Sequence, residues 1–328
     1  MSFKLKNTIL LIGYGSIGKR YAEILSLQNK VVVYDKNYSA YDSNSEGRNL
    51  FFTKELETVL SEKINGVVVA TPPDSHDYYA DYFKKFEAPL LIEKPLANNL
   101  SSAQNILATS QNRNSPTFVV CNMRYHHGIT TIEKNIPLLG QIYNVKVCFE
   151  NDLRNMRPSI DYRKTYAASL DSGGCILDCI HELDYVNFLF GISSIHSGRA
   201  IKLSDLEIER EDCANFSLDL NNRAVCEVSL NYFSLVKIRS CRVTGEYGVI
   251  DWFSIGKNPE KCKVVLYKTD ETKILFESKD LLNNAPYNKM LADFTYVVEG
   301  GDKSNTKLQS VEQALHSLQL ALKMREMS

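Results

Sequence analysis

The chain has 328 residues, of which 44% are hydrophobic and 23% charged, and its formal net charge is -1 at pH 7. This is the composition of an ordinary globular protein with room for two cores, and the near-zero charge gives no electrostatic reason to bind nucleic acid or an anionic membrane. No apolar run approaches the roughly 18 residues of a membrane span. No signal-peptide pattern opens the chain, and its eight cysteines form no C-x-x-C pair. We therefore expect a cytoplasmic protein with reduced thiols and no metal site.

The N-terminal segment has the pattern of a dinucleotide-binding unit. An apolar run at residues 8–12 predicts a buried parallel strand, helical periodicity follows at 19–28, and residues 31–34 predict a second strand. The loop between the first strand and the helix consists of Gly13, Tyr14, Gly15, Ser16, Ile17 and Gly18. Its glycines allow a tight turn, the approach of a pyrophosphate and close packing of helix on strand, so this order of elements predicts a cofactor site.

Asp35 directly follows the second strand and bears on the choice of cofactor. A carboxylate at this position accepts hydrogen bonds from the ribose 2′-hydroxyl of NAD and repels the 2′-phosphate of NADP. Lys36 is its neighbour and offsets part of that repulsion. We expect NAD to be preferred, with NADP as the alternative.

Strands and helices continue to alternate as far as residue 122. Further strands are expected at 49–52, 66–70, 89–93 and 117–121, with helices at 54–62, 74–83 and 101–111. Six strands in this order predict a doubly wound parallel Rossmann sheet, whose ligands bind at the carboxyl ends of the strands. The polar residues expected at these ends are Thr71, Glu93, Lys94 and Asn122.

Residues 171–191 carry the candidate chemistry of the second half. The pattern predicts a single helix that is entered through two glycines and closed by Gly191. Its polar side consists of Asp178, His181, Glu182 and Tyr185. A neutral imidazole beside a carboxylate accepts a proton at neutral pH, so Asp178 and His181 form a candidate acid–base pair. The alternative is a surface helix with solvated polar residues.

The remainder of the chain alternates with period two. Such segments lie at residues 142–149, 213–220, 224–231 and 239–244, with a hairpin expected at 262–267 and 272–276 and a last helix at 308–324. This alternation predicts a mostly antiparallel sheet with one face packed against a hydrophobic core. We therefore expect two domains: a dinucleotide-binding Rossmann domain at 1–122 and an α+β substrate-binding domain at 123–328.

Four motifs occur in a fixed order along the chain. They are the glycine loop, Thr71-Pro72-Pro73-Asp74-Ser75-His76, Glu93-Lys94-Pro95, and the helix with Asp178 and His181. Together they resemble the Gfo/Idh/MocA family of NAD(P)-dependent oxidoreductases over essentially the whole chain. The tripeptide Glu93-Lys94-Pro95 combined with the later helix is the most specific part of the resemblance.

The resemblance implies roles for individual residues. Lys94 would orient the substrate hydroxyl near the nicotinamide, His181 would be the general acid/base, and Asp178 would position His181 or the substrate. The cofactor contacts it implies are Gly13, Tyr14, Gly15, Ser16, Ile17, Gly18, Asp35, Lys36, Thr71, Pro72, His76, Glu93, Lys94, Asn122 and Arg163. Of these, His76 is better explained as a structural histidine near the cofactor than as a catalyst. The candidate substrate contacts are Arg124, Tyr125, Tyr162 and Arg163.

Two departures from the family pattern affect these assignments. Tyr162 stands where the family has a tryptophan before the arginine, and Asp178 precedes His181 by three positions where four is the common spacing. Both spacings keep the pair on one helical face. The roles are therefore retained, with Asp178 acting directly or by orienting His181.

The resulting functional prediction is an NAD(P)-dependent oxidoreductase acting on a secondary alcohol or ketone of a sugar, inositol or nucleotide-sugar-like substrate. Four arginines would suit an anionic group on that substrate: Arg124, Arg154, Arg157 and Arg163. The alternative function is a non-catalytic NAD(P)-binding sensor on the same scaffold, which has no need of a proton carrier such as His181. The family also implies a homodimer or homotetramer formed through the open face of the second sheet.

Overall fold

The computed structural model of the chain describes residues 5–36, 49–60, 63–156, 160–256, 259–282 and 284–327. It divides into two compact units, one of Met1–Cys121 with Tyr287–Leu315 and the other of Asn122–Pro286 with His316–Ser328. The expected domain boundary at residue 122 lies beside this division, but residues 287–315 belong to the first unit. Period-two and helical patterns do not show to which core a late segment returns. Within the described part of the chain, every helix is too short or too polar to span a membrane.

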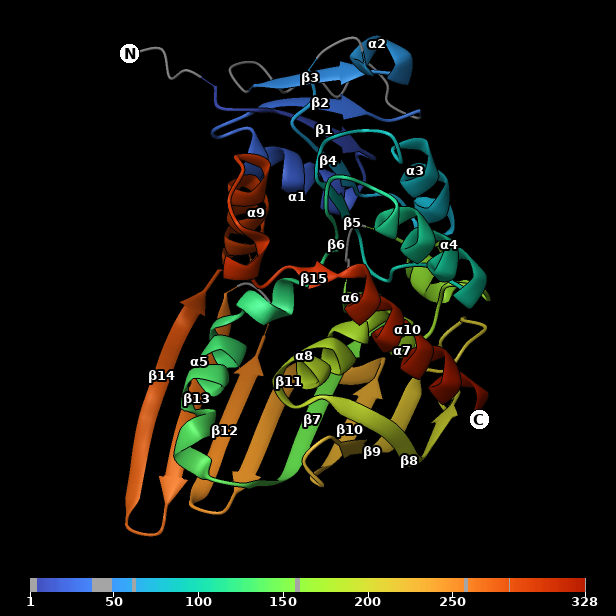
Figure 1. The fold of residues 1–328 in the computed structure, drawn as a ribbon. Helices are drawn as coiled ribbons and strands as arrows, with labels where there is room; N and C mark the ends of the chain where they lie inside the picture. Colours follow the sequence, from blue (N-terminus) through green and yellow to red (C-terminus); the bar gives the residue numbers. More distant parts are fainter. Residues whose placement is uncertain are drawn as a thin grey trace. The chain divides into compact units, whose positions relative to one another are not determined.

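The sheet of the first unit has seven strands in the order β15-β6-β5-β4-β1-β2-β3 (Figure 1). Their bounds are β1 Thr8–Ile12, β2 Lys30–Tyr34, β3 Leu50–Thr53, β4 Gly66–Val69, β5 Leu90–Ile92, β6 Thr117–Val119 and β15 Gln309–Ser310. Strands β1 to β6 are parallel, and β15 adds to β6 in the antiparallel sense. This strand order is that of a doubly wound Rossmann sheet and confirms the prediction.

Helices cover both faces of this sheet, which explains why its strands are continuous apolar runs. Ile9, Leu10, Leu11 and Ile12 of β1 are all fully buried. The helical segments of the unit are α1 Ser16–Leu25, α2 Leu56–Leu60, η2 Pro73–Ser75, α3 His76–Tyr82, α4 Leu100–Gln111, α9 Ala285–Val298 and η7 Lys303–Asn305. In Figure 1, α1 and α9 lie on one side of the sheet and α3 and α4 on the other. The sequence analysis did not predict α9.

The second unit is built on an eight-stranded sheet in the order β14-β13-β12-β11-β7-β10-β9-β8. The bounds are β7 Ile142–Asp152, β8 Ile192–Ile201, β9 Cys213–Leu220, β10 Val225–Asn231, β11 Phe233–Gly245, β12 Gly248–Ile255, β13 Glu260–Lys268 and β14 Glu271–Leu281. All neighbouring pairs are antiparallel except β7 with β10. The predicted mostly antiparallel sheet is therefore confirmed, although β8 and β12 were not predicted.

Helices pack on one face of the second sheet, and the other face is exposed. In β10, Cys226, Val228 and Leu230 are buried while Val225 and Glu227 are exposed. The helical segments are η3 Asn122–Tyr125, α5 His127–Asn135, η4 Ile136–Leu139, α6 Leu153–Met156, η5 Tyr162–Lys164, η6 Tyr166–Ala168, α7 Cys175–Asp178, α8 Ile180–Phe190 and α10 Val311–Glu326. In Figure 1, α5 lies over β12 to β14 and α8 lies nearer β7. The period-two pattern thus identified a sheet with one buried face.

Candidate active site

The glycine loop between β1 and α1 leaves the helix N-terminus unblocked. Gly13 has a φ of +93°, and a side-chain carbon there would lie 2.7 Å from the carbonyl oxygen of Ala70. A side-chain carbon at Gly18 would lie 2.1 Å from the carbonyl oxygen of Gly13, whereas one at Gly15 would meet none of the described atoms within 4 Å. Within the described residues of α1, no acidic side chain occupies the first turn and no side chain caps it. The loop therefore fits a pyrophosphate, because bare backbone and the positive end of a helix face the open side.

Asp35 is held against this loop at the end of β2. Its Oδ2 accepts a hydrogen bond of 2.7 Å from the backbone N–H of Tyr14. The N–H of Gly13 donates to the carbonyl oxygen of Tyr34 at 2.8 Å, which ties the loop to the same strand end. Lys36 beside it is exposed. A carboxylate fixed at this point suits hydrogen bonding to the ribose hydroxyl of a dinucleotide.

His76 is a fully buried residue that joins two loops at the carboxyl edge of the first sheet. Its Nδ1 lies 3.1 Å from the carbonyl oxygens of Pro95 and Leu96, and its Nε2 lies 2.9 Å from that of Thr71. Burial lowers the pKa of the imidazole, although the bonds to backbone carbonyls act in the opposite direction. Both ring nitrogens are engaged by the backbone, so the structure places His76 in a structural role and leaves Thr71 and exposed Pro72 nearer to solvent.

Glu93 and Lys94 follow β5. Glu93 is only 7% exposed, and its carboxylate accepts hydrogen bonds from the hydroxyl of Tyr21 and, at 3.0 Å, from the N–H of Lys94. Lys94 itself is partly exposed and precedes a cis peptide bond to Pro95. The carboxylate of Glu93 is thus bonded inside the protein, to Tyr21 and to the backbone of Lys94.

Asn122 opens η3 just after β6. It is 7% exposed, and its Oδ1 is buried without a hydrogen-bond partner among the described residues. An unsatisfied buried carbonyl oxygen costs about 1–3 kcal/mol, so the atom suits a ligand that donates a hydrogen bond. This acceptor without a partner lies at the start of the second unit, shortly after β6 in the chain.

The helix predicted at 171–191 is broken in the second unit. α7 ends at Asp178 and α8 begins at Ile180, because Cys179 has φ -93° and ψ 26°. The carboxylate of Asp178 accepts hydrogen bonds from the hydroxyl of Tyr166 and, at 3.0 Å, from that of Tyr232. Asp178 is 9% exposed. The single continuous helix was therefore a wrong prediction, and tyrosine hydroxyls hold the carboxylate at the break.

His181 lies in the first turn of α8 and is partly exposed. The next residue, Glu182, is fully buried and lies 2.8 Å from Nε of Arg239. Tyr185 is also fully buried, with its ring 6.3 Å from that of Trp252. The alternative of a solvated polar face is therefore wrong for this helix: of its predicted polar side, His181 is the member that reaches the surface.

The expected substrate contacts are largely engaged within the second unit. Arg124 is 2% exposed and binds Asp184 through two hydrogen bonds of 2.6 and 3.0 Å, so it is a structural residue and not an open anion site. Arg163 pairs with Asp161 at 2.9 Å and with Glu207 at 3.1 Å. The pairs with Asp184 and Glu207 are tertiary contacts that the sequence does not show, whereas Asp161 lies two residues before Arg163.

The other candidates near this segment show the same pattern. The hydroxyl of Tyr162 accepts a hydrogen bond of 3.1 Å from the N–H of Glu207, and Tyr125 is 5% exposed. Arg154 pairs with Asp152 at 3.0 Å, and Arg157 lies outside the described residues. Arg124 is buried and paired, so it does not support an anionic substrate. Arg154 and Arg163 are paired as well and support it only weakly.

Family models match both halves of the chain. A model described as an oxidoreductase family with an NAD-binding Rossmann fold matches residues 7–120. A model described as the C-terminal alpha/beta domain of the same oxidoreductases matches residues 132–326. The chain belongs to the Gfo/Idh/MocA family. Its first unit is an NAD-binding Rossmann domain, and the predicted family is confirmed.

Relatives within and around this family are distant. The chain is 27% identical over 212 residues to glucose-6-phosphate 3-dehydrogenase of Bacillus subtilis (strain 168), covering 62% of this chain and 59% of that protein. It is 26% identical over 189 residues to inositol 2-dehydrogenase of Rhizobium meliloti (strain 1021), covering 55% and 54%. The chain thus spans little more than half the length of these curated relatives.

Solved structures share the fold over the whole chain. An oxidoreductase from Agrobacterium radiobacter, solved in complex with NAD+, L-tartaric acid and magnesium, matches with a TM-score of 0.80 and 17% identity. The match covers 98% of this chain and 96% of that chain. At this identity, the likeness shows a shared fold.

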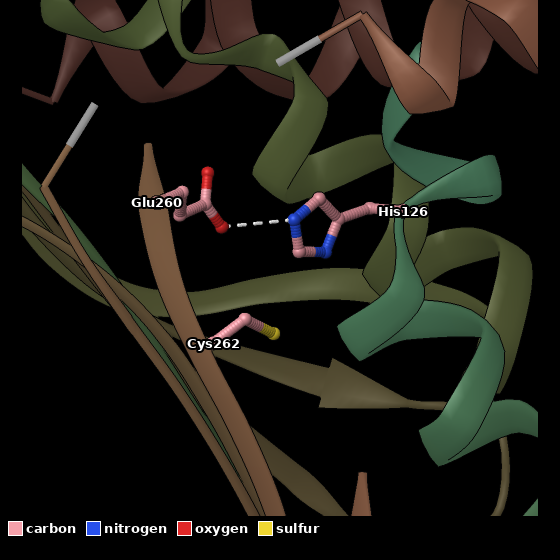
Figure 2. Close-up of side chains that lie close together, drawn as sticks. All are labelled: His126, Glu260 and Cys262. Atoms are coloured by element: carbon pink, nitrogen blue, oxygen red, sulfur yellow. Dashed lines mark hydrogen bonds and ion pairs between the residues drawn. The ribbon is translucent and has the colours of Figure 1, made fainter. Parts of the chain in front are cut away.

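A further cluster in this Gfo/Idh/MocA chain brings His126, Glu260 and Cys262 together, with their ligand atoms within 4.8 Å of one another (Figure 2). The N–H of Gly128 donates to Nδ1 of His126 at 3.0 Å, so Nδ1 is the acceptor of the neutral ring. The ring proton therefore lies on Nε2, which donates to Glu260 at 3.0 Å. Burial raises the pKa of the Cys262 thiol to about 12. His126 and Glu260 therefore form an internal hydrogen bond, with the thiol of Cys262 beside them.

The sequence analysis missed the residues that support the candidate site. Tyr21, Tyr166 and Tyr232 donate their hydroxyls to Glu93 and Asp178, and Arg239 pairs with Glu182. The sequence separations are long, so no local spacing could reveal these pairs. The one available signal was the unusual presence of buried carboxylates, which require donors in any fold.

Proposed function

We propose that the chain is an NAD-dependent dehydrogenase acting on a CH–OH group of a sugar, inositol or nucleotide-sugar-like compound. The observation that carries the proposal is Lys94, a partly exposed cation at the carboxyl end of β5 in an NAD-binding sheet. Ligands of such sheets bind beyond the carboxyl ends of the strands, so this side chain is suited to a reacting group. His181, partly exposed at the start of α8, supplies a proton carrier.

In the oxidative direction, His181 takes the proton of the substrate hydroxyl. The ammonium group of Lys94 stabilises the negative charge that develops on the same oxygen. Bound NAD supplies the acceptor for the hydride that leaves the carbon. Asp178 acts as a positioning residue for His181 or the substrate, since tyrosine hydroxyls fix both of its oxygens.

The substrate class is proposed from two kinds of support. The relatives include enzymes named for glucose 6-phosphate and for inositol, which share a ring of secondary alcohols. The arginines Arg124, Arg154 and Arg163 are paired with carboxylates in the second unit. These three arginines therefore do not by themselves favour an anionic member of the class.

A homo-oligomer and a cytoplasmic location are part of the same proposal. The exposed face of the second sheet carries Tyr143, Phe253 and Tyr267, each at least 40% exposed. A hollow of about 580 Å³ on this face is lined by residues such as Lys146, Asn215 and Arg242. Exposed aromatic rings on a broad sheet support self-association, and sedimentation analysis measures it directly.

The proposal is tested by incubating the purified protein and NAD with sugars, inositols and nucleotide sugars while following the absorbance of the reduced nicotinamide. We expect turnover with at least one compound of this set. We also expect tighter binding of NAD(H) than of NADP(H), because Asp35 lies at the ribose side. Binding without turnover across the whole set would favour the sensor function instead. Tighter binding of NADP(H) would show that Lys36 dominates over Asp35.

A further inference from the structure

A buried polar cluster lies beneath Lys94 in the first unit. Tyr21 of α1 is fully buried, and its ring lies 6.1 Å from that of Tyr287 at the start of α9. The guanidinium of Arg20 lies over the Tyr287 ring at 4.7 Å. Glu93 enters this cluster from the end of β5. The carboxylate of Glu93 thus lies among residues of α1 and α9 that are far away in sequence. The tripeptide Glu93-Lys94-Pro95 accounts only for Glu93 and Lys94.

The hydrogen bonds of Glu93 join this cluster to the backbone of Lys94. One carboxylate oxygen accepts from the hydroxyl of Tyr21, and the other accepts from the N–H of Lys94 at 3.0 Å. The N–H of Glu93 donates to the carbonyl oxygen of Val69 at 2.9 Å, which fixes its own backbone to β4. The peptide between Glu93 and Lys94 is therefore held from the strand on one side and from the carboxylate on the other.

The charge on this carboxylate depends on a small number of groups. Burial raises the pKa of Glu93, while the bond from Tyr21, the charge and N–H of Lys94, and the charge of Arg20 lower it. Burial also raises the pKa of Tyr21 well above its ordinary value, so its hydroxyl keeps the proton that it donates. The pKa of Tyr287 is raised by burial as well, so that ring is neutral too.

We propose that Tyr21 and Glu93 are positioning residues for Lys94: the Tyr21 hydroxyl keeps Glu93 ionised, and the carboxylate fixes the Lys94 peptide and its ammonium charge. The inference rests on the proposed function only for the role of Lys94 as the group beside the reacting oxygen. The state of Glu93 itself is a property of the first unit and can be measured without substrate.

The first test measures Glu93 directly. Carbon-13 NMR of glutamate side-chain carboxyls, with the Glu93 signal identified by its loss in Glu93→Gln, follows the ionisation of Glu93 in the full chain. In Tyr21→Phe the midpoint should move to higher pH, because the hydrogen bond that stabilised the carboxylate is gone. Tyr287→Phe removes the hydroxyl of a partly exposed tyrosine in the same cluster and serves as the control, with an unchanged midpoint. An unchanged midpoint in Tyr21→Phe would overturn the proposal.

The second test uses turnover. Tyr21→Phe should lower kcat by about tenfold with the KM for NAD unchanged, since one hydrogen bond to a charged group is lost beneath the reacting lysine. Glu93→Gln should move the alkaline limb of the rate to lower pH, because Lys94 loses a neighbouring negative charge. A kcat and alkaline limb that match wild type in both variants would reduce Tyr21 to a packing role. If wild type has no dehydrogenase activity, the proposed function fails while the NMR titration still decides the state of Glu93.

Discussion

Glu93 in the first unit and Glu260 in the second are buried to the same extent, each 7% exposed, yet their pKa values move in opposite directions. For Glu93, burial raises the pKa by more than Tyr21 and Lys94 lower it. Few donors reach it, and one of them is the N–H of a partly exposed lysine. The ionisation of Glu93 is therefore sensitive to its neighbours.

Glu260 is a buried carboxylate whose neighbours stabilise its ionised form. Burial raises its pKa, but hydrogen bonds from His126 and Ser254 and the charge of Lys237 lower it further, to about 2. Lys237 lies 3.6 Å from Oε2. The comparison teaches that burial alone does not mark a functional carboxylate. The two carboxylates differ in their neighbours. Those around Glu260 lower its pKa by more than burial raises it, whereas those around Glu93 do not.

The largest expected effect separates the histidines of the second unit. His181→Asn removes the proposed proton carrier and should lower turnover by roughly 10²–10⁴-fold. In wild type, the oxidative rate should rise with pH as the imidazole loses its proton, and the variant should lack that limb. His126→Asn is the control, because both ring nitrogens of His126 are bonded inside the protein. A wild-type pH–rate profile in His181→Asn would move the acid–base role elsewhere.

The next largest effect should distinguish Lys94, which follows Glu93 in the chain, from Lys237, which lies beside Glu260. Lys94→Ala should reduce turnover by roughly 10²–10³-fold, through loss of a positioned charge at the reacting oxygen, with NAD affinity nearly unchanged. Lys237→Ala removes a cation from beside Glu260 and should leave turnover unchanged while lowering the thermal midpoint. Equal turnover losses in both variants would contradict the distinction between the two sites.

Much of the fold could be predicted from the sequence, but the hydrogen-bond partners that hold the site residues could not. Buried strands such as β1 and the alternating β9 carry periodicities that depend on local burial, so their positions followed from the pattern alone. The break between α7 and α8 is marked by no glycine or proline: it lies at Cys179, beside the tyrosine-bound Asp178. The partners of Glu93 likewise come from α1, far away in sequence.

A third prediction tests the fixed charge of Glu260 by acid unfolding. Its pKa falls from an ordinary 4.5 to about 2 on folding, which corresponds to about 3 kcal/mol of stability. Because the pKa is lowered, this stability is present above pH 4.5 and is lost as the pH falls towards 2. Glu260→Gln should therefore be less stable at neutral pH and flatter in that acid range. Glu93→Gln should keep the acid loss of the wild type, because Glu260 is still present and the raised pKa of Glu93 contributes no stability that acid removes.

The smallest expected effect concerns a third carboxylate, Asp178, whose hydrogen-bond donors are tyrosine hydroxyls. The hydroxyl of Tyr232 also lies 3.0 Å from the carbonyl oxygen of Gly174, and its single proton serves only one acceptor at a time. Tyr166, which is partly exposed, is therefore the more committed donor to the carboxylate. Tyr166→Phe should lower turnover by about tenfold with little change in thermal midpoint, since one hydrogen bond to a charged group is lost at the edge of the unit.

Tyr232→Phe is the matched variant, because it removes the other hydroxyl from a fully buried position. It should cost about 1–3 kcal/mol of stability, since a buried acceptor loses its donor, and should change turnover less than Tyr166→Phe does. Asp178→Asn, compared in the same assay, should reproduce the turnover loss of Tyr166→Phe if the tyrosine acts through the carboxylate. If Asp178→Asn is as active as wild type while Tyr166→Phe is not, the hydroxyl of Tyr166 acts on the substrate directly. Asp178 would then resemble Glu260, a carboxylate that serves the fold at the break between α7 and α8.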